Sequence, residues 1–119
     1  MENWMQLLQQ AVEEAASDVF FVAGKPACQK LEGRICPLSG ERLMPADTDA
    51  IVRQLYQTAG RSMEHYERFH DDDFSFAVPG LARFRVNAYR QRGSAAAVIR
   101  VVSFDIPDWQ ALGIPREVM

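Results

Sequence analysis

The sequence predicts an α+β domain in which helices gather mainly on one face of an antiparallel sheet. Two stretches, residues 3–16 and 45–60, carry apolar residues at helical spacing with charged or amide side chains between them. Short runs that alternate apolar and polar residues lie between these stretches and after them. Turn sequences join the last of these runs, which favours antiparallel pairing. A length of 119 residues suits one such domain.

The first half of the chain is predicted to hold two helices with short strands between them. In order, the elements are a helix over residues 3–16, strands over 18–24 and 27–33 followed by the sequence RICPL, and a helix over 45–60. In the first helix, Trp4 and Leu8 belong to the apolar side. The second helix has Asp47 or Thr48 as its N-cap and Gly60 as its C-cap.

The second half is predicted to hold a short helix and three antiparallel strands. In order, these are a helix from Ser62 to the acidic run Asp71–Asp73, strands over 73–78, 82–89 and 95–102, and a short helix within 107–119. The first two strands meet at the Pro79-Gly80 turn. A loop of either two or four residues within 91–94 joins the last two.

Composition narrows the classes of function. The formal charge of −3 argues against a nucleic-acid-binding protein, so any basic site must be local. Cys28 and Cys36 form neither a disulfide framework nor a zinc pattern, and we expect free thiols in a reducing compartment. The sequence shows no signal peptide and no apolar stretch near the ~20 residues that span a bilayer. We therefore expect a cytoplasmic domain without direct membrane insertion.

Arginines in the last two strands are the strongest functional signal. In the strand ARFRVNA, Arg83 and Arg85 point away from the apolar residues that alternate with them. A symmetric hairpin pairs residues whose numbers sum to 185, which places Arg85 directly opposite Arg100. Opposed like charges cost about 0.2–1 kcal/mol. Arg100 also lies within the apolar run AVIRVV, where a guanidinium needs an acceptor.

Two interpretations of these arginines are open. They could pack over Phe74 and Phe76 or pair with the acidic run Asp71–Asp73, as many arginines in sheets do. Alternatively, Arg85 and Arg100 could form a receptor for a polyphosphate, because guanidinium groups are forked and always charged. The chain has no G-x-x-x-x-G-K-[ST] loop, so the phosphates would have to arrive on another domain.

Other polar clusters are weaker candidates. Consecutive carboxylates at Asp71–Asp73 lack the spacing of a calcium loop, and we interpret them as a solvated helix end rather than a metal site. His65 and His70 are not spaced as zinc ligands on a helix. Asp18 is interpreted as ending the first helix or ordering the turn after it, and a subunit contact is the weaker alternative. We predict no metal site.

Two blocks of sequence resemble a known family. ASDVFFVAGKPACQKLEGRI (16–35) and DFSFAVPGLARFRVNAYRQRG (73–93) are similar to signatures of the twitching motility, or type IV pilus retraction, ATPases of the secretion ATPase superfamily. The sequence ALGIP (111–115) resembles the connector before the ATPase domain of that family. Phe20 replaces the usual histidine of the first block and Lys30 a usual arginine, so any role of that histidine is absent.

The resemblance implies a PAS-like N-terminal domain over residues 1–104 and a connector over 105–119 toward a RecA-like ATPase domain. It implies ATP and Mg in the full-length protein, with neither expected in this fragment, which should be inactive alone. It also implies a hexamer at the pilus machinery of the inner membrane, with Arg85 and Arg100, and Arg83 beside them, contacting the nucleotide phosphates. Alternatives are a pilus extension or type II secretion ATPase, or a free-standing PAS-like module that binds a ligand or a protein.

Overall fold

The structure is a computed structural model that describes residues 3–104 of the chain. Its elements are α1 (Trp4–Glu13), β1 (Asp18–Val22), β2 (Pro26–Leu31), β3 (Arg34–Arg42), α2 (Pro45–Ala59), α3 (Glu64–Phe69), β4 (Asp71–Val78), β5 (Ala82–Gln91) and β6 (Ser94–Phe104). The predicted α+β class with an antiparallel sheet is confirmed. The helix predicted within 107–119 and the connector over 105–119 lie outside the described residues.

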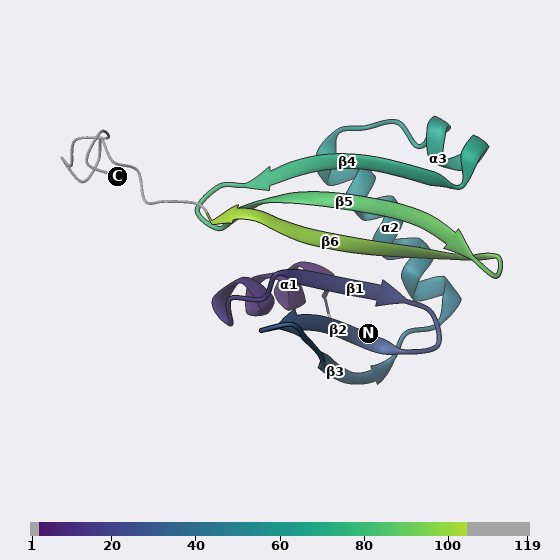
Figure 1. Cartoon of the computed structure of the whole chain (residues 1–119). Helices are drawn as coiled ribbons and strands as arrows, with labels where there is room; N and C mark the ends of the chain where they lie inside the picture. Colours follow the sequence, from purple (N-terminus) through teal and green to yellow (C-terminus); the bar gives the residue numbers. More distant parts are fainter. Residues whose placement is uncertain (1–2, 105–119) are drawn as a thin grey trace, which may run out of the picture.

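The strands form one six-stranded sheet in the order β3-β2-β1-β6-β5-β4, and every neighbouring pair is antiparallel (Figure 1). Two three-stranded meanders, one from each half of the chain, meet where β1 pairs with β6. The first and last strands of the fold are therefore hydrogen-bonded neighbours at the centre of the sheet. This pairing brings the start of β1 beside the middle of β6.

The helices cover one face of this sheet, as Figure 1 shows for α1 and α2. The alternation of the strands turns their apolar side chains toward these helices, where they are buried with the apolar side of α1 and α2. The ring of Trp4 meets the ring of Phe76 edge to face, and Tyr56 packs on Phe74 at 4.4 Å between ring centroids. The opposite face of β5 and β6 carries no helix in the described residues.

The turn between β5 and β6 sets the register of the two strands. Gln91 pairs with Ser94, so the loop has two residues, Arg92 and Gly93, with φ angles of 54° and 80°. Positive φ at both positions is the type I′ geometry that suits the twist of a hairpin. From this turn the predicted register holds as far as Phe84 opposite Val101, after which a register shift moves Arg83 opposite Ser103.

Candidate functional site

Arg85 and Arg100 are directly opposed on β5 and β6, as the register predicted. Both side chains are exposed on the sheet face that lacks helices, and the Arg100 side chain is 71% exposed. Arg83 lies on the same face of β5, two residues before Arg85. The three predicted site residues are therefore neighbours on one surface, and all of them come from the inner strands β5 and β6.

A carboxylate meets one of these arginines. Asp18 begins β1 opposite Arg100, and the Arg100 Nε–H donates to Asp18 Oδ1 at 3.3 Å. Asp18 is 7% exposed, and its second oxygen accepts a hydrogen bond of 2.8 Å from the Ser17 hydroxyl. Sequence reasoning assigned Asp18 to the helix end or the following turn and missed this pair, because 82 residues separate the two partners.

Arg85 has no such partner. Within residues 3–104, neither a hydrogen bond nor an ion pair engages the guanidinium groups of Arg83 and Arg85. A shallow depression of about 180 Å³ lies between the opposed arginines; it is lined by Asp18, Asp73, Arg85, Asn87, Val98 and Arg100. A second depression of about 370 Å³ adjoins it and is lined by Arg83 and Arg85 with residues of β4 and Val102. The surface thus offers a guanidinium free to bind an anion.

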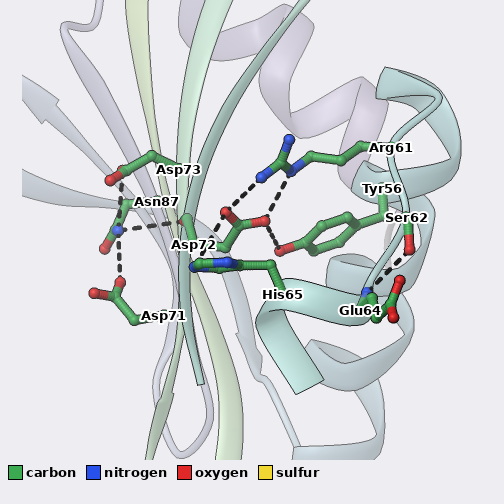
Figure 2. Close-up of polar contacts among 9 residues, drawn as sticks. All are labelled: Tyr56, Arg61, Ser62, Glu64, His65, Asp71, Asp72, Asp73 and Asn87. Carbon is green, nitrogen blue, oxygen red and sulfur yellow. Dashed lines mark hydrogen bonds and ion pairs between the residues drawn. The ribbon is translucent and has the colours of Figure 1, made fainter. Parts of the chain in front are cut away.

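The acidic run does not neutralise Arg85, because each of its carboxylates is used elsewhere (Figure 2). Asp72 turns toward the helices, where it accepts 2.8 Å hydrogen bonds from Arg61 Nε, Arg61 Nη2 and the Tyr56 hydroxyl. Asp71 and Asp73 each accept a 3.1 Å hydrogen bond from Asn87 Nδ2. These residues begin β4, so their interpretation as a solvated helix end was wrong.

The alternative packing of the site arginines over aromatic rings is also not observed. Phe74 and Phe76 are buried on the helix side of the sheet, opposite to Arg85. The guanidinium that does lie over Phe74, at 6.0 Å from the ring centroid, belongs to Arg61. Neither local interpretation from the sequence therefore accounts for Arg85.

The surroundings of Asp72 favour its ionised form. The hydrogen bond from Arg61 lowers the pKa of Asp72 against the opposing effect of its burial, and the Tyr56 hydroxyl adds to the lowering. Burial, with the nearby Asp72 carboxylate, raises the pKa of Tyr56 far above its ordinary value. Asp72 is therefore an ionised group that holds β4 to the helices, and it is not available to a ligand on the other face.

The chain was compared with known families, curated proteins and solved structures. A scan against models of protein families finds no match. The chain is 32% identical over 93% of its length to the type IV pilus ATPase PilU of Pseudomonas aeruginosa, and 32% identical over 92% of its length to the type IV pilus retraction ATPase PilT of the same organism. It is structurally similar to the pilus retraction motor PilT with bound ADP, with 34% identity, a TM-score of 0.76 and 99% of the chain covered.

Over nearly its whole length this chain is similar to a part of the type IV pilus ATPases PilU and PilT. It spans 28% and 31% of the length of PilU and PilT, and 34% of the solved PilT chain. The ATPase DotB of Legionella pneumophila, 20% identical with a TM-score of 0.67 over 97% of this chain and 32% of its own, shares the fold. The resemblance inferred from the two sequence blocks is thus confirmed.

The remaining residues that the sequence analysis considered lie outside this arginine surface. Cys28 and Cys36 are free, half-buried thiols. The His65 ring packs against Phe69, and its Nε2 lies 4.0 Å from Asp72. Residues 3–104 hold no cluster of three metal-ligating side chains, and none of their helices is long and apolar enough to cross a membrane. Phe20 is half-buried opposite Val98.

Proposed function

We propose that this chain is the N-terminal domain of a hexameric, cytoplasmic pilus retraction ATPase and that its open sheet face contacts ATP phosphates held by a separate RecA-like domain. Residues 1–104 form the domain, and 105–119 lead toward the ATPase domain. Similarity to PilT and PilU, of which this chain spans about a third, supports the assignment. The unpartnered Arg85 opposite Arg100 is the observation that carries the phosphate-contact role.

Guanidinium groups fit this role because they are permanently charged and present several donors in one plane. During phosphoryl transfer, negative charge spreads over the phosphate oxygens, and fixed donors that meet this charge lower the barrier. Arg85 and Arg100 supply such donors, with Arg83 beside them. The chain contributes no phosphate-binding loop of its own, so we assign ATP and its Mg to the RecA-like domain.

The proposed partners follow from this arrangement. The open face closes on the RecA-like domain of the same protein, neighbouring subunits complete the ring, and the ring acts on the pilus machinery at the inner membrane. The formal charge of −3 argues against nucleic acid as a partner. Retraction rather than extension or secretion is the finer part of the proposal, and the similarity to PilT supports it.

Substitutions in the longer protein that carries this chain test the proposal. Arg85→Ala and Arg100→Ala should each reduce steady-state ATP hydrolysis by about 100-fold or more. Arg53→Ala is the matched control, because Arg53 is an exposed arginine on α2 whose partner is Asp49. Thermal unfolding of the 119-residue chain should show that all three variants fold, with Arg100→Ala less stable than the other two because it leaves the buried Asp18 carboxylate without its cation. Undiminished hydrolysis by the Arg85 and Arg100 variants would reject the role.

A further inference from the structure

We infer that Asp18 is the positioning residue of this site: it holds Arg100 by Nε and leaves the two terminal nitrogens of the guanidinium for the phosphates. The inference rests on the proposed function, in which Arg100 contacts a polyphosphate. Asp18 is buried, and it acts on the phosphates only through Arg100.

The contact between the two side chains uses one edge of the guanidinium. Arg100 donates from Nε to Asp18 Oδ1 at 3.3 Å, and neither Nη1 nor Nη2 donates a hydrogen bond within residues 3–104. A guanidinium has five N–H donors in one plane, four of them on the terminal nitrogens. A carboxylate at Nε therefore fixes the plane of the group while its outer edge stays free to meet phosphate oxygens.

The carboxylate that does this is itself held firmly. Its second oxygen accepts from the Ser17 hydroxyl at 2.8 Å. The Ser17 backbone N–H donates to Lys30 on β2, and the Ser17 carbonyl accepts from Val101 on β6, each at 3.0 Å. Asp18 thus lies between two neighbouring strands that fix its backbone, and it is only 7% exposed. Arg100, 71% exposed, gains from this contact an orientation that a free surface arginine lacks.

Asp18 also has an electrostatic effect that must be separated from positioning. Its negative charge offsets part of the repulsion between Arg85 and Arg100, but it also weakens their attraction for an anion. A carboxylate that only competed for Arg100 would inhibit phosphate binding. Replacing Asp18 with either asparagine or alanine removes the charge, whereas asparagine alone keeps an oxygen that can accept from Arg100 Nε. This pair of variants isolates positioning from charge.

The experiment measures binding of sodium tripolyphosphate to the 119-residue chain by NMR at constant ionic strength, following the arginine Nε–Hε signals. We expect Asp18→Ala to bind about 2- to 10-fold more weakly than Asp18→Asn, the effect of immobilising one flexible side chain. With Arg100→Ala present as well, the two variants should bind equally. The Arg53 signal, from an arginine paired with Asp49, is the internal reference.

The arginine Nε–Hε signals also report, in the absence of tripolyphosphate, whether Asp18 holds Arg100 in place. The Nε–Hε signal of Arg100 should exchange slowly with water in the wild type and in Asp18→Asn, and rapidly in Asp18→Ala. Identical Arg100 signals in the two variants, or equal tripolyphosphate affinity where binding occurs, would overturn the inference. If Arg85→Ala and Arg100→Ala instead leave tripolyphosphate binding unchanged, the proposed phosphate contact fails, and the ligand-free signal still decides whether Asp18 positions Arg100.

Discussion

At the scale of single residues, Asp72 shows how the fold keeps acidic groups away from the arginine surface. Its side chain is 4% exposed and is surrounded by donors from α2, the α2–α3 connection and α3 (Figure 2). Asp71 and Asp73, on the other side of the strand, share the amide of Asn87. The alternation of β4 therefore sends one carboxylate to the helices and two to a neighbouring amide, and Arg85 stays unpaired.

The lowered pKa of Asp72 predicts acid sensitivity. A carboxyl whose folded pKa lies below its unfolded value of about 3.9 stabilises the fold above that value, and this contribution is lost as the pH falls through the folded pKa. Asp72→Asn should lower the free energy of unfolding at pH 7 by about 1–3 kcal/mol, because charged hydrogen bonds are lost. Below about pH 4 the difference from the wild type should shrink.

Urea unfolding of the wild type and Asp72→Asn between neutral pH and about pH 2 checks this prediction. Asp49→Asn serves as the control, since Asp49 forms an exposed ion pair with Arg53 on α2 and such pairs contribute little to stability. A stability difference between wild type and Asp72→Asn that is constant with pH would contradict the assignment.

At the scale of elements, the β5–β6 hairpin determines whether the two site arginines face each other. Its two-residue turn sets the register, and a loop longer or shorter by one residue would move Arg100 to the helix side of the sheet. Arg92 adopts a φ of 54°, which asparagine and glycine accept more readily than arginine. The turn is therefore not optimised, although its glycine is placed as the geometry requires.

Two turn substitutions should change stability in opposite directions. Arg92→Asn should raise the free energy of unfolding by about 0.5 kcal/mol, because asparagine suits the first position of a type I′ turn. Gly93→Ala should lower it by about 1 kcal/mol: no atom lies within 4 Å of an added Cβ, so the cost comes from the backbone angle of 80°. Denaturant unfolding measures both. An equal effect of the two substitutions would argue against the type I′ turn.

The elements also show what the sequence could and could not predict. The β5–β6 register followed from local alternation and a short loop, so Arg85 opposite Arg100 was accessible from sequence. The β1–β6 pairing joins distant parts of the chain, and no local pattern places Asp18 beside Arg100. Asp72 did leave a signal, because it shares the parity of the buried Phe74, but its acidic neighbours suggested a solvated segment. The phosphate-contact role of the arginines stays a proposal.

At the scale of the whole molecule, the sheet has a central part and two edges of different character. β6 and β5 are flanked by strands on both sides, whereas β3 and β4 are edges. β3 is largely exposed, contains Pro37 and pairs with β2 across a register shift. β4 is packed against α2 and α3. Stability should therefore decrease from the centre of the sheet toward β3.

Native-state hydrogen exchange of the 119-residue chain checks this gradient. We expect the slowest amides around Val86 and Ile99, which are fully buried and directly paired. The amides of β3 should exchange faster by orders of magnitude, through local opening that leaves the centre intact. Equal protection across all six strands would show instead that the sheet opens only as a whole.

The location of Arg85 and Arg100 on adjacent inner strands has a mechanical consequence. Directly opposed residues keep their Cα atoms about 4.5–5.5 Å apart, and the ladder of hydrogen bonds on either side prevents that spacing from changing. When the domain tilts, the backbone positions of both arginines therefore move together, and their side chains reach outward from a base of fixed width. Two donors on such a base are better suited to a chain of linked phosphates than to isolated ions.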